Sequence, residues 1–311
     1  MRVRIGVTVS RRSGWRIFPL VAFNVWLAGG RAVRWQTGYD VNVDAVDGII
    51  IGGSLGEAST LSLTERRALL QTGLATSAGR VPVLMNIAER RTATAIQQAQ
   101  TLEEDGANGF MLLPPLNYGA SPDETVAYFR AVAQATHLPI VIYNNPVDYK
   151  IGVSTDMFAQ LIDLPNIQAV KESTRDLTNV TRLRNAFGER IKILGGVDTL
   201  ALECLVAGGD GWIAGLVNAF PRETVVLYRL VKAGRLDEAL QLYRWFMPLL
   251  ELDIHPKLVQ YIKLAAVATG LGTEYTRAPR LALSGAERQR IQGIIDRALA
   301  QRPDLQAYEN L

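Results

Sequence analysis

Residues 47–53 read DGIIIGG, a short apolar run that ends in two glycines. Its apolar residues are consecutive and do not alternate with polar ones, which is typical of a parallel β-strand buried on both faces. Six similar runs follow along the chain, at 81–87, 109–114, 139–143, 167–171, 191–196 and 211–215. The repetition of buried strands predicts a parallel sheet of the α/β class.

Helical patterns separate these strands and begin near Thr64, Thr92, Pro122, Ser154, Asp176, Asp198 and Pro221. The first carries a start signal, because Ser62 precedes Glu65 by three residues, as in a capping box. Together with a first strand at 17–23 (IFPLVAF), the seven strands make eight β/α units and predict a (β/α)8 TIM barrel. A doubly wound open sheet is the alternative, because repetition alone does not show closure.

Strand patterns stop after the last of these runs, and the rest of the chain is helical. One helix at 222–233 completes the barrel, and three more are expected at about 235–251, 257–270 and 284–300. The predicted organisation has three parts. They are an N-terminal basic segment at 1–16, a barrel at 17–233 and a C-terminal helical extension at 234–311.

The composition excludes several classes of protein. Of the 311 residues, 48% are hydrophobic and 20% are charged, which suits a packed globular chain and excludes a disordered one. The single cysteine, Cys204, excludes a disulfide framework and a cysteine-based metal cluster. Two histidines leave little room for a histidine metal site, so we expect no bound metal.

The formal net charge of +3 is distributed unevenly. Residues 1–45 hold seven arginines and two aspartates, a net charge of +5. The remaining residues then hold 26 basic and 28 acidic side chains, a net charge of −2. Because the body of the chain is slightly acidic, we expect no nucleic-acid partner.

The stretch at 20–45 is anomalous for a barrel. Glycines interrupt it, and it lacks the apolar stripe of a first barrel helix. Arg11-Arg12 before the apolar residues 17–30 loosely resemble a twin-arginine export signal, but 14 residues are too few to span a bilayer. We expect a cytoplasmic protein with no membrane partner. We hypothesise that a frame or gene-start anomaly, or recent divergence, explains this stretch.

Lys171 is the first candidate for chemistry, one of six lysines beside 27 arginines. It ends the run at 167–171, and the carboxyl ends of barrel strands face the active site. Desolvation there lowers the pKa of an amine and favours its neutral form, which forms Schiff bases with carbonyl groups. A solvated or ion-paired lysine fits the same position equally well.

Two other strand ends carry candidate residues. Tyr143 ends the preceding strand in YNNP, where it could relay protons beside the lysine or simply cap the barrel mouth. The loop at 52–57 (GGSLGE) follows the second strand, and its backbone N–H groups could hold a carboxylate, although an ordinary turn is equally consistent. The loop matches neither the dinucleotide fingerprint nor the P-loop.

Three motifs taken together, GSLGE, YNNP and KEST (171–174), resemble the dihydrodipicolinate synthase/N-acetylneuraminate lyase family. Residues 208–213 (GGDGWI) are similar to the family's last strand. The resemblance covers about 46–300 and fails over about 20–45, where the family has a regular first helix. It implies class I Schiff-base chemistry on 2-oxo acids and a homodimer or homotetramer. It implies no organic cofactor, because the lysine iminium is the electron sink.

The resemblance also implies roles for single residues. Lys171 matches the imine-forming lysine, and Tyr143 matches the tyrosine that relays protons. Gly53 and Ser54 match the residues that hold the substrate carboxylate, and Ser54 is expected to contact the Tyr143 hydroxyl as well. Two further substrate-binding positions are Ile213, whose carbonyl is expected near the lysine, and Asp198, which matches a hydroxyl-binding position of the sugar-acid lyases.

Three residues depart from the lysine-biosynthetic synthase of the family. Leu55 replaces a relay threonine, Asp148 replaces an arginine that binds the aldehyde's carboxylate, and Leu116 replaces a tyrosine contributed across the dimer. Leucine cannot relay a proton, and aspartate repels a carboxylate. We therefore expect a changed substrate and a changed outcome after the imine forms.

The leading expectation is a Schiff-base-forming dehydratase or deaminase that acts on a small 2-oxo acid or a cyclic imine. GSLGE, YNNP and residues 253–257 (DIHPK) look most like hydroxyproline-catabolic members, which convert 1-pyrroline-4-hydroxy-2-carboxylate to 2-oxoglutarate semialdehyde. Within the class, the alternatives are a 4-hydroxy-tetrahydrodipicolinate synthase and a 2-keto-3-deoxy sugar-acid aldolase or dehydratase. A non-catalytic barrel that binds 2-oxo acids is the alternative from another class.

Overall fold

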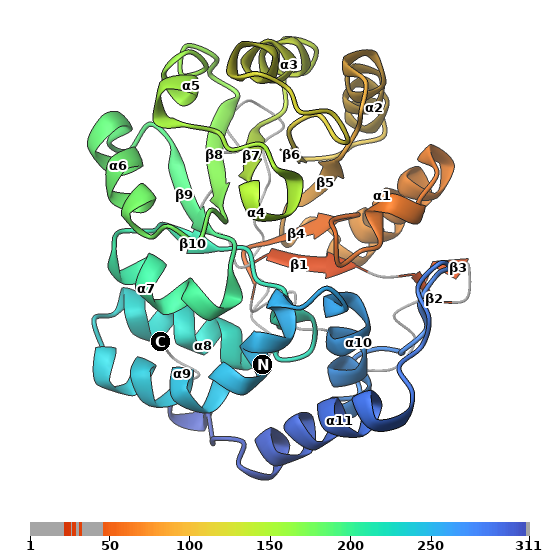
Figure 1. Ribbon diagram of the computed structural model, residues 1–311, viewed down its shortest axis with the longest axis vertical. Helices are drawn as coiled ribbons and strands as arrows, with labels where there is room; N and C mark the ends of the chain where they lie inside the picture. The colour runs from red at the N-terminus through yellow and green to blue at the C-terminus, as the bar shows by residue number, and fades with distance from the viewer. Residues whose placement is uncertain (1–21, 26, 29–30, 33–45, 309–311) are drawn as a thin grey trace, which may run out of the picture.

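The computed structural model describes residues 22–25, 27–28, 31–32 and 46–308. Eight strands form one parallel sheet in which neighbours in space follow one another in sequence (Figure 1). A doubly wound sheet would reverse its strand order at one point, and this sheet does not. The strands are β1 (Ala22–Val25), β4 (Gly48–Ile51), β5 (Val83–Ile87), β6 (Gly109–Leu112), β7 (Ile140–Asn144), β8 (Ile167–Glu172), β9 (Lys192–Gly195) and β10 (Gly211–Trp212).

The sheet curls so that its two ends approach each other (Figure 1). Strand β1 lies against η3 (Leu216–Asn218), the turn that follows β10. No hydrogen-bonded ladder joins β10 to β1 within the described ranges. This curled parallel sheet surrounded by helices is consistent with the predicted (β/α)8 barrel.

Helices alternate with the strands, at or near the predicted starts. The capping box of the first helix forms as predicted: Ser62 Oγ accepts the Glu65 N–H, and the Glu65 carboxylate accepts the Ser62 N–H. The helix near Asp198 begins with the 3-10 turn η2 (Asp198–Leu200). The helices are α1 (Leu63–Ser77), α2 (Thr92–Glu104), α3 (Pro122–Gln134), α5 (Thr155–Ala159), α6 (Thr178–Phe187), α7 (Ala201–Val206) and α8 (Pro221–Lys232).

The strands are buried on both faces, which is why their sequences are continuously apolar. In β4, Ile50 belongs to a small cluster with Leu84, Met111 and Val141. Ile49 and Ile51 belong instead to the large cluster that includes helix residues such as Leu69 and Phe129. The small cluster fills the inside of the curled sheet, and the large one joins its outside to the helices.

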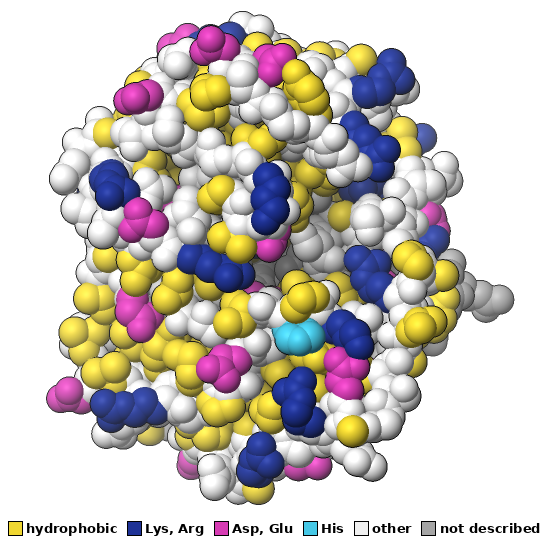
Figure 2. All heavy atoms as spheres, viewed as in Figure 1, with side chains coloured by type: hydrophobic (Ala, Val, Ile, Leu, Met, Phe, Trp, Pro, Cys, Tyr) yellow, Lys and Arg dark blue, Asp and Glu magenta, His cyan; other side chains and the backbone are white. Residues whose placement is uncertain are grey.

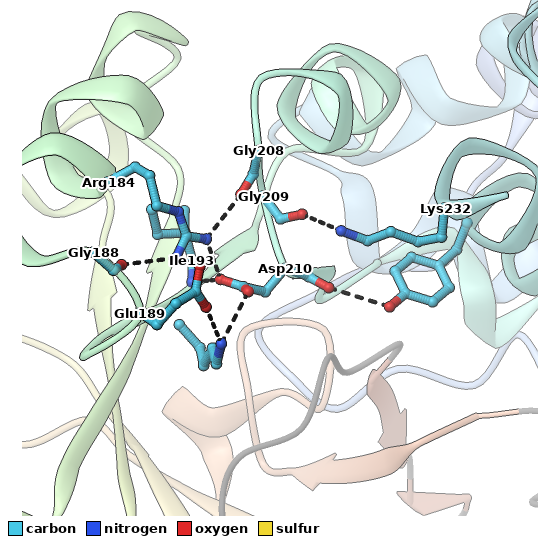
Figure 3. Close-up of polar contacts among 10 residues, drawn as sticks. Arg184, Gly188, Glu189, Ile193, Gly208, Gly209, Asp210 and Lys232 are labelled. Atoms are coloured by element: carbon cyan, nitrogen blue, oxygen red, sulfur yellow. Dashed lines mark hydrogen bonds and ion pairs between the residues drawn. The ribbon is translucent and has the colours of Figure 1, made fainter. Parts of the chain in front are cut away.

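Asp210 anchors the amino ends of β9 and β10 (Figure 3). Its carboxylate accepts the Ile193 N–H at 2.8 Å and pairs with Arg184 Nη2 at 2.6 Å and Lys192 Nζ at 3.3 Å. Arg184 also donates to the Gly208 carbonyl, and Lys232 to the Gly209 carbonyl. These contacts hold a strand that is only two residues long.

Three helices follow α8, as predicted: α9 (Leu236–Leu250), α10 (Leu258–Ala268) and α11 (Gly285–Ala300). Helix α9 packs on α8, and α11 packs on α9 and α10. The 3-10 turn η4 (Glu251–Ile254) lies against η2, which follows β9. The extension therefore reaches the carboxyl end of the sheet, where the candidate residues lie.

The N-terminal prediction is only partly within the described residues. Strand β1 overlaps the predicted strand 17–23 at Ala22 and Phe23 and continues to Val25, whereas 17–21 lie outside the described residues. Beyond it, β2 (Leu27–Ala28) pairs antiparallel with β3 (Arg31–Ala32). The described part of the anomalous stretch (20–45) thus holds β1 and the β2–β3 strand pair and no helix. The basic segment 1–16 and residues 33–45 lie outside the description.

Within the described ranges, no helix is both long and apolar enough to cross a bilayer.

Candidate active site

A cavity open to solvent lies at the carboxyl ends of the strands. Figure 2 shows a hollow near the centre of this face, with Lys or Arg side chains around it. Five of the six predicted site residues line the cavity: Gly53, Ser54, Tyr143, Lys171 and Ile213. The structure thus brings together residues from four strand ends that are far apart in sequence.

Lys171 lies beside Tyr143 in the register of β7 and β8, and its Nζ is 4.2 Å from the centroid of the tyrosine ring. Burial lowers the pKa of the Lys171 amine, although the charges of Asp253 and Asp198 partly oppose that shift. A lowered pKa increases the fraction of neutral amine, the form that attacks a carbonyl. The environment of Lys171 therefore favours Schiff-base formation.

The aliphatic part of Lys171 packs on Gly196, which follows β9. A Cβ at Gly196 would lie 2.7 Å from Lys171 Cγ, 2.8 Å from its Cε and 2.1 Å from Ser173 Oγ. No side chain fits there unless the lysine moves. Glycine at this position therefore fixes the course of the lysine across the cavity floor.

Tyr143 is buried, with 7% of its surface exposed. Its hydroxyl accepts a hydrogen bond from Asn145 Nδ2 at 3.1 Å. Burial raises the pKa of Tyr143, so the phenol keeps its proton at neutral pH. The residue can therefore donate a proton to a group that develops charge next to Lys171.

Ser54 does not contact the tyrosine predicted for it. Its Oγ lies 2.7 Å from the hydroxyl of Tyr149, a residue of the short helix α4 (Pro146–Tyr149), instead of bonding to Tyr143. The rings of Tyr149 and Tyr143 meet edge to face, with their centroids 5.6 Å apart. The prediction of a Ser54–Tyr143 contact is corrected: a second tyrosine stands between them.

Asp198 differs from the other predicted residues because it does not line the cavity. It is fully buried, and its Oδ1 accepts the Trp212 Nε1–H at 3.1 Å and the Gly215 N–H at 2.9 Å. Its Oδ2 accepts the Leu216 N–H at 2.7 Å. Trp212 of β10 and the backbone after that strand bind both oxygens, so Asp198 positions that segment and lies outside the cavity lining.

The departures from the synthase pattern are visible at the same site. Leu55 and Asp148 line the cavity, and Leu116 packs against the cluster inside the sheet. Asn145 holds Asp148 through two hydrogen bonds, Nδ2 to Asp148 Oδ2 at 2.8 Å and Asp148 N–H to Asn145 Oδ1 at 3.2 Å. A carboxylate therefore occupies the wall where the synthase pattern has an arginine.

Sequence reasoning missed several residues at this site. Tyr149 gave only a weak signal, because it lies in a four-residue helix too short to show periodicity. Ser173 lies two residues beyond Lys171 in the KEST motif, is buried and lines the cavity. Asp253 belongs to the C-terminal extension and reaches the cavity only through the fold.

Comparison with known proteins gives a consistent result. The family model described as the dihydrodipicolinate synthetase family matches residues 32–298. A 4-hydroxy-tetrahydrodipicolinate synthase from Thermomicrobium roseum is 32% identical over 249 residues, 79% of this chain and 82% of that protein. One from Exiguobacterium sibiricum is 33% identical over 244 residues, 78% of this chain and 82% of the relative.

Solved structures give the same result for the fold. The structure of the 4-hydroxy-tetrahydrodipicolinate synthase from Methylacidiphilum fumariolicum superposes with a TM-score of 0.83 at 25% identity. The match covers 93% of this chain and 98% of that one.

Proposed function

The chain belongs to the dihydrodipicolinate synthetase family of class I lyases, and we propose that its Lys171 forms the Schiff base with a small 2-oxo acid. The observation that carries this proposal is the Lys171 amine, desolvated and placed 4.2 Å from the ring of a buried tyrosine. Gly53 and Ser54 are proposed to hold the substrate carboxylate, and Ile213 lines the same cavity.

In the proposed mechanism, the neutral Lys171 amine adds to C2 of the substrate. Tyr143 gives its proton to the departing oxygen or ring nitrogen as the iminium forms. The resulting phenolate then removes a proton from C3. The iminium accepts the electron pair, so the enamine can attack an aldehyde or expel a leaving group from C4.

Two outcomes of that enamine are candidates. The relatives support addition to an aldehyde, because the proteins matched over most of this chain are described as 4-hydroxy-tetrahydrodipicolinate synthases. The cavity supports elimination from a hydroxylated substrate, such as 1-pyrroline-4-hydroxy-2-carboxylate. Asp148 on its wall would repel the carboxylate of an acidic aldehyde and accept a hydrogen bond from a hydroxyl.

Borohydride trapping tests the Schiff base. Intact-mass measurement after reduction with pyruvate, with 2-keto-3-deoxy sugar acids and with the hydroxypyrroline should show a covalent adduct. Peptide mapping should place the adduct on Lys171, and Lys171→Ala should show neither adduct nor turnover. A Lys171→Ala variant that keeps full turnover would contradict the proposal.

The products formed from each substrate distinguish the candidate reactions of the enamine. Condensation of pyruvate with an aldehyde supports the synthase, and loss of water from a hydroxylated substrate supports the dehydratase or deaminase. A 2-keto-3-deoxy sugar acid cleaved to pyruvate supports the aldolase. Binding without an adduct or turnover supports the non-catalytic barrel. Self-association as a homodimer or homotetramer stays a prediction, which light scattering after size-exclusion chromatography can check.

A further inference from the structure

Asp253 is a cavity residue to which the proposed Schiff-base steps give no role. It lies in η4 of the C-terminal extension and lines the cavity with Lys171 and Tyr143. Its carboxylate forms no hydrogen bond or ion pair with any of the residues that the structure describes. Two other polar side chains at the site are engaged by neighbours: Asp148 by Asn145, and Ser54 by Tyr149.

The Asp253 carboxyl group packs against Gly215, which has no side chain to displace it. A Cβ at Gly215 would lie 2.0 Å from Asp253 Oδ1 and 2.6 Å from its Cγ, so the carboxyl group rests directly on the glycine backbone. Asp198 fixes that backbone by accepting the Gly215 N–H at 2.9 Å. Asp253 therefore packs closely on a backbone that is itself held in place, and it lines the cavity.

Charged groups face Asp253 from several elements. Burial raises the pKa of the Asp253 carboxyl well above its usual range, and the charges of Asp198 on η2 and Asp148 on α4 raise it further. Lys171 on β8 and Arg175, which follows that strand, act in the opposite direction. Because burial dominates, Asp253 keeps its proton to a higher pH than a solvated carboxyl and can act as an acid there.

We propose that Asp253 is the catalytic acid that protonates a hydroxyl group leaving from C4 of the substrate. The inference rests on the proposed Schiff base at Lys171 and names the substrate class, a 2-oxo acid or cyclic imine with a hydroxyl two carbons from the imine carbon. Asp253 suits this role because it faces the cavity that holds Lys171 and has no other proton partner among the described residues.

The step balances in atoms and charge. The electron pair of the enamine forms the C3–C4 double bond and restores the iminium at C2, while the C4–O bond breaks. The oxygen takes the Asp253 proton and leaves as water, and Asp253 becomes a carboxylate. Hydrolysis of the iminium later releases one proton, which returns to Asp253. No oxidant, reductant or other reactant is needed.

Asp253→Asn separates this step from imine formation. We expect borohydride to trap Lys171 with pyruvate as in the wild type, which also shows that the site is folded. Dehydration of the 4-hydroxy substrate should fall by about 10²–10⁴-fold, the usual contribution of a general acid. A 4-chloro analogue, whose leaving group needs no proton, should react at nearly the wild-type rate. Asp237→Asn, at an exposed position on α9, is the matched control and should keep both rates.

Three results would overturn the inference. The Asp253→Asn variant could dehydrate the hydroxy substrate at the wild-type rate, or could lose the hydroxy and chloro reactions equally, as a positioning role would require. The wild type could also be trapped at Lys171 and yet dehydrate no hydroxylated 2-oxo acid or hydroxypyrroline. Absence of any adduct in the wild type would instead contradict the proposed function, so the two failures are distinguishable.

Discussion

Lys171 is the residue whose chemistry depends most on its surroundings. Burial lowers the pKa of its amine below the ordinary 10.5, while burial raises the pKa of the neighbouring Tyr143. The neutral fraction of an amine grows as pH rises through its pKa. We therefore predict that the rate of adduct formation with pyruvate rises with pH and levels off below the pH expected of a solvated lysine.

Stopped-flow mixing followed by borohydride quench, over a series of pH values, measures this profile. Tyr143 keeps its proton through the rise, because its pKa is displaced upward. A single midpoint at or above 10.5 would show that the amine is not desolvated.

Gly196 decides where that amine points. Gly196→Ala would place a methyl group 2.7 Å from Lys171 Cγ, so the lysine stem must shift. A displacement of about 1 Å costs on the order of 10²-fold in rate, and we predict a loss of that size in kcat. Gly119→Ala is the matched control, because a Cβ at Gly119 meets no atom within 4 Å. Equal kcat values for the two variants would refute the steric argument.

The sequence predicts the positions of some site residues but not the partners or roles of others. Lys171 and Tyr143 end apolar runs, and that local pattern already places them at the carboxyl ends of buried strands. The partner of Ser54 could not be predicted in this way, because Tyr149 is 95 residues away and lies in a helix of four residues. The predicted hydroxyl-binding role of Asp198 does not fit its position, because the residue is fully buried and does not line the cavity.

At the scale of elements, the short strand β10 depends on side-chain contacts made by Asp210 (Figure 3). Asp210→Asn would replace one acceptor oxygen by a donor that faces either Arg184 or Lys192. Hydrogen bonds to charged groups contribute about 1.5–3 kcal/mol each, and the network is partly exposed. We predict a loss of about 1–2 kcal/mol in the free energy of unfolding, measured by urea denaturation.

Asp210 lies at the amino ends of the strands, away from Lys171, so trapping by pyruvate should be unchanged in Asp210→Asn. Asp123→Asn, at an exposed position in the first turn of α3, is the comparison and should lose at most about 1 kcal/mol. If the two variants had the same stability, the Asp210 network would not be stabilising β10.

At the scale of the whole molecule, one buried ion pair joins the glycine loop to the C-terminal extension. Glu57 and Lys263 are 206 residues apart, their side chains are 2% and 1% exposed, and Lys263 Nζ lies 2.7 Å from Glu57 Oε2. Glu57 Oε1 also accepts the Arg277 N–H. The Glu57 N–H bonds to the Ser54 carbonyl, so the pair supports the loop that carries Ser54.

Removing one partner leaves a buried charge without compensation, which typically costs about 3–5 kcal/mol. We predict that Glu57→Gln loses about that much stability. The double variant Glu57→Gln/Lys263→Met should recover part of the loss, because no charge is then left in the interior. Thermal and urea denaturation of both variants measure the coupling. This explanation would be contradicted if the double variant lost more unfolding free energy than the two single variants lose together.

The sequence alone predicts the parallel sheet, the alternating helices, the C-terminal helices and the strand-end positions of Lys171 and Tyr143. These follow from local rules, because a strand buried on both faces must be apolar along its length and a helix start needs its cap. The tertiary structure alone decided which side chains meet: Tyr149 with Ser54, Asp198 with the segment after β10, and Asp253 with the cavity. Such contacts depend on how the sheet curls and where the extension crosses its carboxyl end, and no local pattern in the chain records that geometry.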